Sequence, residues 1–248
     1  MTRGTGAQST TRTLHSQAAS MIGQRIVSGE WLAGAALPTE ADLSRELNVS
    51  RASLREAIKL LAGKGLIRST PRRGTIVQPT ATWNRLDPDV LVWQAFGGPT
   101  AVFVRDLFEL RRMIEPSAAA LAAARASPDD RKIIAAAFAA MEQAVDVQSS
   151  IEADLAFHRA IMVATGNALL ASFLPAIEAS LSVSFRVSRA GETQPHVIPM
   201  HRAVAEPIVA GEPEQARAAM HALLNRSETD ATSAVVESKG PARKGSRA

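Results

Sequence analysis

The sequence predicts a mainly α-helical protein with two domains. Runs of Ala and Leu at helix-compatible spacing fill much of the 248 residues, and stretches rich in β-branched residues are few. A chain of this length can form two modest domains. Its charge is uneven, because Lys and Arg outnumber Asp and Glu 11 to 5 in residues 1–80 but are outnumbered 13 to 18 in residues 81–230. We therefore expect a basic head on an acidic helical body.

Composition excludes several classes of protein. The chain has no Cys, which rules out a disulfide framework and any Cys-based metal site or nucleophile. No apolar run is long enough to span a bilayer, and the polar N-terminus lacks the apolar segment of a signal peptide. We expect a cytoplasmic protein with no membrane partner. The basic head suits a nucleic-acid partner, although ordinary solvated surface charge would give the same composition.

The head is expected to occupy residues 13–80, after a disordered N-terminus at 1–12 that is small and polar. Its first helix has apolar residues at every fourth position and ends near Ser28-Gly29, because Gly tolerates the backbone conformation of a helix end. The apolar residues of this stripe are Leu14, Ala18, Ile22 and Ile26.

A second helix begins after Leu37-Pro38, with Thr39 as the expected N-cap and Asp42 completing an approximate capping box. Asn48-Val49 forms the turn that follows, and Ser50 caps a third helix. One arc of this third helix is apolar, with Leu54, Ile58 and Leu61. The neighbouring arc is basic, with Arg51, Arg55 and Lys59 at i, i+4 and i+8.

Two short strands are predicted next, at Leu66–Arg68 and Thr75–Val77, joined by the basic turn Pro71-Arg72-Arg73-Gly74. Helix, turn, helix and hairpin together are the outline of a winged helix-turn-helix. In that fold the apolar arc holds the recognition helix to the domain, while the basic arc enters the major groove, where Arg can read guanine. A lone pair of Arg residues would favour a solvated surface helix instead. The complete set of elements favours sequence-specific DNA binding.

A linker at 81–99 and a body at 100–230 follow the head. In the linker, Asp87-Pro88 is a natural helix start, and Trp83, Leu86 and Trp93 are expected to dock it against the domains. The body breaks into helical segments that predict an all-helical antiparallel bundle. The tail at 231–248 is polar and basic, and we expect it to be disordered. The predicted helices are Val102–Ala126, Asp129–Gln148, Ile151–Thr165, Ala168–Val187, His196–Ala210 and Pro213–Thr229.

The body also contains a candidate metal site. Asp154 and His158, four residues apart, project from one helical face, and His201 and His221 lie on later helices that could converge on it. Oxygen and imidazole ligands suit a divalent ion such as zinc or nickel. Each His alone is more often an ordinary core or surface residue.

The head resembles the DNA-binding domain of GntR-superfamily regulators. The resemblance lies in Leu37–Glu40, Val49–Arg51, Leu54–Ala57 and Gly74–Val77. It implies that Ser50, Arg51 and Arg55 contact DNA and that the wing contributes Arg72, Arg73 and Gly74. Family members often have a basic DNA-contacting residue where this chain has Ala41, so that contact is expected to be missing.

The body resembles the FCD effector domain of the FadR subfamily, through Glu109–Pro116, Asp154–His158, Asn167 and the segment from His201 to Gly211. The resemblance implies an Asp-x-x-x-His pair, two later His ligands, and an effector held by Arg111 and Asn167. The usual last His falls at Leu223. Because two residues on a helix are about 200° apart around its axis, His221 is expected to point elsewhere. Arg111 could instead form an ion pair with Glu109 or Glu115.

These observations predict a homodimeric, ligand-responsive transcription regulator that binds a double-stranded DNA operator. A repressor of a catabolic operon, released by a small carboxylate or sugar acid, is favoured. The linker at Trp83–Trp93 resembles that of regulators of sugar-acid catabolism, including the galactonate-responsive group. The alternatives are a metal-dependent enzyme at Asp154, His158 and His201, although the chain has no HExxH motif, and a general DNA-compacting protein.

Overall fold

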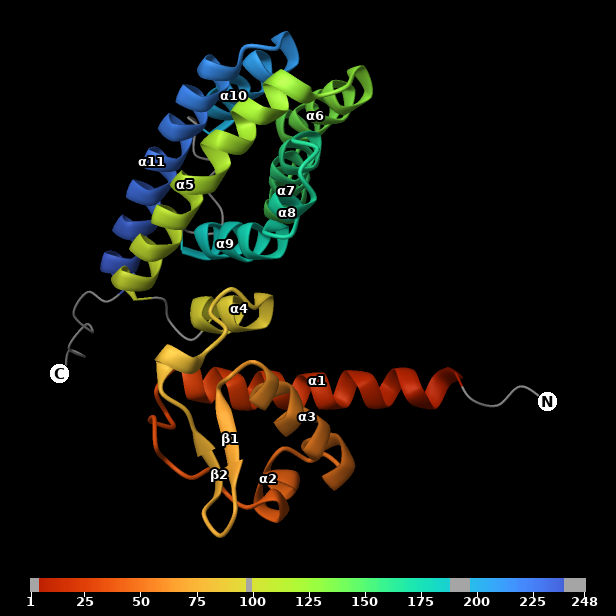
Figure 1. Ribbon diagram of the computed structural model, residues 1–248, viewed down its shortest axis with the longest axis vertical. Helices are drawn as coiled ribbons and strands as arrows, with labels where there is room; N and C mark the ends of the chain where they lie inside the picture. The colour runs from red at the N-terminus through yellow and green to blue at the C-terminus, as the bar shows by residue number, and fades with distance from the viewer. Residues whose placement is uncertain (1–4, 97–99, 188–196, 239–248) are drawn as a thin grey trace, which may run out of the picture. The chain divides into compact units, whose positions relative to one another are not determined.

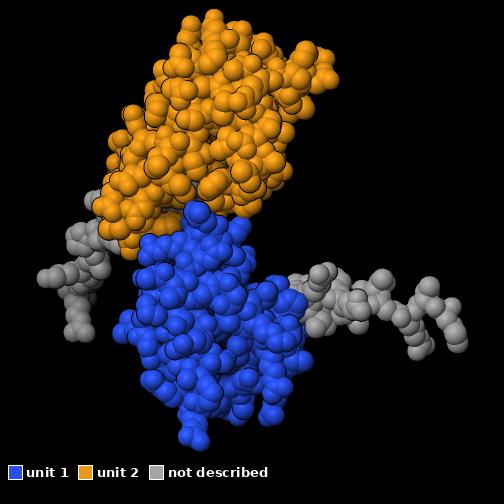
Figure 2. Space-filling view, viewed as in Figure 1, with its two compact units in different colours: residues 1–98 blue, residues 99–248 orange. Residues whose placement is uncertain are grey.

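The computed structural model describes residues 5–96, 100–187 and 197–238. Expectations for residues 1–4, 97–99, 188–196 and 239–248 lie outside these ranges, including the helix start at His196. The chain separates into two compact units, unit 1 at residues 1–98 and unit 2 at residues 99–248 (Figure 2). Among the described residues, no helix combines the length and apolar character needed to cross a membrane.

Unit 1 has the order of elements that the sequence predicts for a winged helix-turn-helix (Figure 1). Its helix α1 begins at Thr5, so residues 5–12 are helical where we expected disorder. No proline interrupts this stretch, and a helix that is already nucleated extends at little cost. The elements are α1 (Thr5–Val27), α2 (Glu40–Glu46), α3 (Arg51–Gly63), β1 (Ile67–Thr70), β2 (Gly74–Val77), the 3-10 turn η1 (Thr80–Thr82) and α4 (Pro88–Phe96).

Side-chain caps begin the two helices of the helix-turn-helix, as the sequence predicts. The Thr39 hydroxyl accepts a hydrogen bond from the backbone N–H of Asp42 at 3.2 Å, and Ser50 accepts one from Ser53 at 3.1 Å. Between them Asn48 has a φ of 52°, a left-handed conformation that Asn tolerates and that makes the turn tight. The start and direction of α3 are therefore set by local chemistry.

The wing is an antiparallel hairpin in which Ile67 pairs with Val77 and Thr70 with Gly74. Its tip needs left-handed backbone, with a φ of 64° at Arg72 and 75° at Gly74. The segment before α2 runs along β2, because Leu37 N–H donates to the Thr75 carbonyl at 2.8 Å. This third partner anchors the hairpin to the rest of unit 1.

Helix α4 packs inside unit 1, on α1. Lys64, at the end of α3, donates to the Asp87 carboxylate at 2.7 Å, and Asp87 in turn caps α4 by accepting from the backbone N–H of Asp89 at 3.0 Å. Trp93 is buried, and its indole N–H donates to Ser20 of α1 at 3.0 Å. The Trp93 anchor expected in the linker thus joins the core of unit 1.

Unit 2 is a helical bundle in which α5 and α11 lie side by side and α6 lies beside α7 (Figure 1). The predicted helix to Gln148 ends at Glu142, and the predicted helix Ala168–Val187 is broken before Pro175, which lacks a backbone donor. Residues 231–238 continue α11 where we expected disorder, since Ala231 packs against Val104 and Phe108. The helices are α5 (Ala101–Arg125), α6 (Pro128–Glu142), α7 (Val147–Ala164), α8 (Ala168–Ala171), α9 (Leu174–Val187), α10 (Val197–Ala210) and α11 (Pro213–Ser238).

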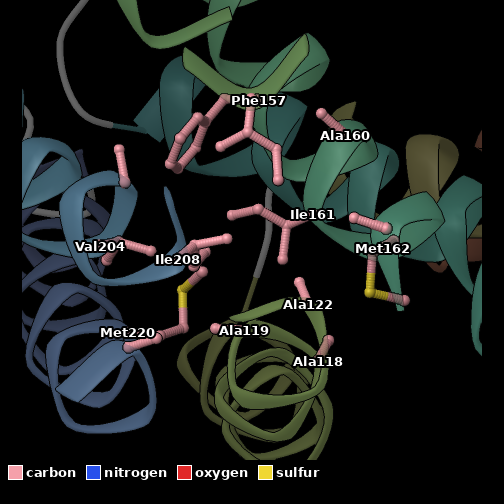
Figure 3. Close-up of a cluster of buried hydrophobic side chains, with 14 of the residues drawn as sticks. Ala118, Ala119, Ala122, Phe157, Ala160, Ile161, Met162, Val204, Ile208 and Met220 are labelled. Carbon is pink, nitrogen blue, oxygen red and sulfur yellow. The ribbon is translucent and has the colours of Figure 1, made fainter. Parts of the chain in front are cut away.

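Alanines on α5 allow the other helices to come close to it. Ala118, Ala119 and Ala122 are almost fully buried, and larger side chains from three other helices fill the space over them (Figure 3). These larger residues are Ile161 and Met162 of α7, Val204 and Ile208 of α10, and Met220 of α11. The close packing brings the polar residues of α5, α7 and α10 within reach of one another.

The contact between α1 and α4 predicts an inverted glycine effect. A Cβ at Gly23 would lie 2.4 Å from ring carbons of Trp93, whereas a Cβ at Gly63 would meet nothing within 4 Å. We expect Gly23→Ala to destabilise unit 1 by about 1–3 kcal/mol through overpacking. Gly63→Ala, the matched control, should be neutral or stabilising by up to about 1 kcal/mol. All three Trp residues lie in unit 1, so urea unfolding followed by Trp fluorescence measures this unit. Equal stability of the two variants would contradict the prediction.

Candidate functional site

The exposed face of α3 carries the basic residues singled out in the sequence. Leu54, Ala57 and Leu61 are fully buried against unit 1, which leaves Arg51 and Arg55 on the solvent side. The Nε of Arg55 donates to Glu40, the first residue of α2, at 2.9 Å. That contact leaves the two terminal nitrogens of the guanidinium free of Glu40. Two nitrogens of one Arg are what a bidentate contact with guanine requires.

The other residues expected at DNA are also exposed in unit 1. Arg72, Arg73 and Gly74 form the tip of the wing, and Ser50 stands at the start of α3 with its hydroxyl used as the helix cap. Ala41 is exposed on α2, so the position that carries a basic residue in similar proteins has an apolar methyl group here.

Unit 2 contains a group of charged and polar side chains in its interior. Each is at most 5% exposed, although such residues are seldom buried without partners. Helix α5 supplies two of them, α7 another two and α10 the fifth. The five residues are Arg111, Glu115, Asp154, His158 and His201.

Both histidines of this group place Nε2 toward Asp154 and use Nδ1 elsewhere. His201 Nε2 lies 2.9 Å from Asp154 Oδ1, and His158 Nε2 lies 3.8 Å from the same oxygen. The Nδ1 of His201 donates to the Val197 carbonyl at 2.8 Å, one turn earlier on α10. Phe157 packs edge-on against both imidazoles, with ring centres 5.8 and 5.6 Å away. The ring therefore walls the two histidines on an apolar side.

Glu115 connects the histidines to Arg111. Its Oε2 lies 2.8 Å from His158 Nδ1, and its Oε1 accepts from Arg111 Nε at 2.5 Å. A second, longer contact of 3.5 Å joins Arg111 Nη2 to Oε2. The ion pair with Glu115 that the sequence left open is thus present. Arg111 Nη1 is buried and has no hydrogen-bond partner among the described residues.

The charges in this interior stabilise one another. Burial alone would raise the pKa of Glu115, but the Arg111 guanidinium and the contact with His158 lower it to about 2. Burial likewise opposes ionisation of Asp154, yet His158 and His201 lower its pKa. For His201 burial favours the neutral form, but its hydrogen bond to Asp154 and the carboxylate charge raise its pKa. A cation between Asp154 and the imidazoles is therefore favoured, whether a proton or a metal ion.

The donor set fits a divalent transition metal. Asp154, His158 and His201 each offer one ligand atom, and these atoms lie within 4.8 Å of one another. The acceptors opposite both Nδ1 atoms leave the Nε2 lone pairs for coordination, as in known metal sites with oriented His ligands. His221 is exposed on α11, outside this group, and Leu223 is buried in the core. Three ligands come from the described residues.

Two further residues sit differently from what their sequence context suggested. Asn167 caps α8, its side-chain oxygen accepting from the backbone N–H of Leu169 at 3.0 Å and of Leu170 at 3.4 Å. Glu115 entered the sequence argument only as an alternative partner of Arg111, and its contact with His158 was missed. Its spacing of four residues from Arg111 signals the ion pair, but no signal in the sequence connects α5 to α7.

The low pKa of Glu115 predicts acid sensitivity. A carboxyl whose pKa falls from 4.5 in the unfolded chain to about 2 in the folded one stabilises the protein fully above pH 4.5. That stability, on the order of 3 kcal/mol, is lost as the pH falls from 4.5 toward 2. Urea unfolding of the metal-free protein by circular dichroism should show this loss in wild type and in Glu109→Gln, an exposed control on α5. In Glu115→Gln the same fall should be smaller. An equal fall in all three would contradict the assignment.

Comparisons with known proteins agree with both units. The model of the gntR family of bacterial regulatory proteins matches residues 14–77, and that of the FCD domain matches residues 106–226. Two solved structures of 18% and 15% identity support the fold alone. One, of Lar, which controls the Listeria monocytogenes agr system, covers 88% of this chain and 95% of its own with a TM-score of 0.61. The other, Escherichia coli McbR/YncC, covers 91% and 98% with a TM-score of 0.53.

Curated relatives cover most of the chain. The galactonate operon transcriptional repressor of Escherichia coli K12 is 32% identical over 190 residues, which is 75% of this chain and 83% of that protein. A provisionally named L-lactate dehydrogenase operon regulatory protein of the same organism is 34% identical over 215 residues, 78% and 76%. YieP, an uncharacterised transcriptional regulator from this bacterium, is 31% identical over 209 residues, 83% and 90%.

These matches replace the alternative of a metal-dependent enzyme, because the family and the relatives are transcription regulators. The winged helix-turn-helix, the helical bundle and the relatives that span both lead to one conclusion. The chain belongs to the GntR family of bacterial regulatory proteins, as a DNA-binding transcription regulator with a C-terminal FCD domain.

Proposed function

We propose that this regulator is a repressor of a catabolic operon and that a small hydroxy acid releases it from DNA. The relatives named above regulate a galactonate operon and an L-lactate dehydrogenase operon, and galactonate and lactate are both hydroxy acids. The buried group of Asp154, His158 and His201, with Arg111 beyond Glu115, is the observation that carries the proposal. It supplies a metal-binding set and a cationic donor inside the FCD unit.

The DNA-reading surface is proposed to be the exposed face of α3 together with the wing. Arg51 and Arg55 would enter the major groove, with Ser50 at the phosphate backbone. Arg72, Arg73 and Gly74 at the wing tip would meet the backbone or the minor groove. The contact of Arg55 with Glu40 supports this assignment, because it limits the directions that a long exposed side chain can take. Two copies in a homodimer would read a pseudo-palindromic operator in the cytoplasm.

Removing either recognition arginine should abolish specific operator binding. We expect Arg51→Ala and Arg55→Ala to lose discrimination between the operator and scrambled DNA, since a bidentate contact with a base contributes about 1–3 kcal/mol. Arg85→Ala is the matched control, because it removes the same charge from an exposed position of unit 1 outside α3 and the wing. Fluorescence anisotropy at physiological salt measures both affinities. Unchanged operator affinity in both variants would show that α3 is not the reading helix.

The ligand site is proposed to combine a metal ion with the effector's carboxylate. Asp154, His158 and His201 would hold zinc or nickel, which accept mixed oxygen and imidazole ligands. Leu223 stands where similar proteins have a further His, so positions on the metal stay open for a ligand from outside the chain. A bound metal supplies a Lewis acid that a hydroxy acid can chelate through carboxylate and hydroxyl oxygens.

Arg111 would assist through a single nitrogen. Its Nε and Nη2 face Glu115, and only Nη1 lacks a partner among the described residues. A carboxylate oxygen at Nη1 would satisfy this buried donor, which otherwise costs about 1–3 kcal/mol. Asn167, expected to take part in effector binding, would have to do so while its oxygen caps α8. The effector lowers DNA affinity only by as much as it prefers the non-binding state.

Metal and effector binding should depend on each other. We expect nickel or zinc to raise the melting temperature of wild type, and galactonate or L-lactate to raise it further only when the metal is present. Addition of a chelator should remove both increments. His201→Ala should lose them, and the control His221→Ala should keep them, because His221 is exposed outside the buried group. Stabilisation by the acids after chelation would refute the metal-assisted site.

A further inference from the structure

Glu115 is the one buried carboxylate of this interior that the proposed metal site does not use. It lies on α5, one turn after Arg111, and is 2% exposed. Its two oxygens divide their contacts between a cation on its own helix and an imidazole on another. Oε1 accepts from Arg111 Nε at 2.5 Å, and Oε2 lies 2.8 Å from His158 Nδ1.

The contact at Oε2 decides which nitrogen of His158 carries the proton. An ionised carboxylate accepts hydrogen bonds and donates none, so the imidazole must donate through Nδ1–H. In the neutral ring Nε2 then has a free lone pair. That lone pair is directed to the side of Asp154, whose Oδ1 is 3.8 Å away, too far for a hydrogen bond. Nε2 of His158 is therefore available to a cation that Asp154 also contacts.

Arg111 keeps Glu115 in the form that this role needs. A buried carboxylate without a counter-ion would take up a proton, and a protonated carboxyl could donate to His158 and reverse the tautomer. The guanidinium prevents this by pairing with Glu115 in a dry interior, where the pKa of the carboxyl stays far below neutral pH. His201 has a backbone carbonyl, that of Val197, in the equivalent place. Only His158 depends on a side chain for its orientation.

We propose that Glu115 is a positioning residue that holds His158 with Nδ1 protonated and thereby presents its Nε2 to a divalent metal ion. Arg111 serves this function as the counter-ion of Glu115. The inference rests on the proposed metal site, and it assigns Glu115 a role outside the set of ligands.

The first test measures the tautomer in wild type, so it does not depend on whether a variant folds. Nitrogen-15 NMR of histidine-labelled, chelator-treated protein at neutral pH should show the Nδ1–H tautomer at His158, with His158→Gln used to assign the signal. This result is independent of metal binding. An Nε2–H tautomer at His158 would overturn the proposal.

The second test measures metal affinity by competition with a chromophoric chelator, with nickel and zinc as the probes. Glu115→Gln should bind about 10- to 100-fold more weakly than wild type, the usual effect of losing a residue that orients a ligand. Glu109→Gln, four residues from Glu115's partner Arg112 side of the same helix and exposed, should bind as wild type does. Equal affinity of both variants would overturn the proposal. Absence of binding by wild type would instead refute the metal site itself, so the two failures are distinguishable.

Discussion

The burial of ionised side chains inside an alanine-rich bundle is the constraint on which the candidate site depends. Removing an ion from water costs several kcal/mol, and a partner offsets this only where hydrogen bonds meet its remaining donors and acceptors. Here each charge has such a partner. Arg111 pairs with Glu115, Glu115 accepts from His158, and His201 faces Asp154. Loss of any one member leaves another buried charge exposed to an apolar surrounding, so the group stands or falls together.

Helix packing makes this arrangement possible. The small side chains of Ala118, Ala119 and Ala122 let α7 and α10 approach the C-terminal half of α5 closely. The same approach brings the polar residues one turn or two earlier on α5 to the histidines of α7 and α10. Phe157, packed edge-on against both imidazoles, keeps one side of the group apolar. An apolar surrounding strengthens the attraction between the opposite charges.

Unit 1 was largely predictable because its elements are set by neighbouring residues. Thr39 and Ser50 cap their helices within three residues, Asn48 makes the turn, and the apolar periodicity of α3 identifies its buried arc. Less predictable were features that depend on distant contacts. The fit of Trp93 over Gly23 joins residues seventy positions apart, and Ala231 extends α11 because it meets Val104 and Phe108. Neither contact has a local signature.

By itself the sequence determined the winged head, the helical body, the basic face of α3 and the pairing of Asp154 with His158, since caps, periodicity and four-residue spacing act within one helix. Only the tertiary structure decided which residues of different helices meet. It brought His201 to Asp154, left His221 on the surface, and placed Glu115 against His158. The reason is geometric, because the rotation and depth of each helix in the bundle follow from side-chain packing along its whole length.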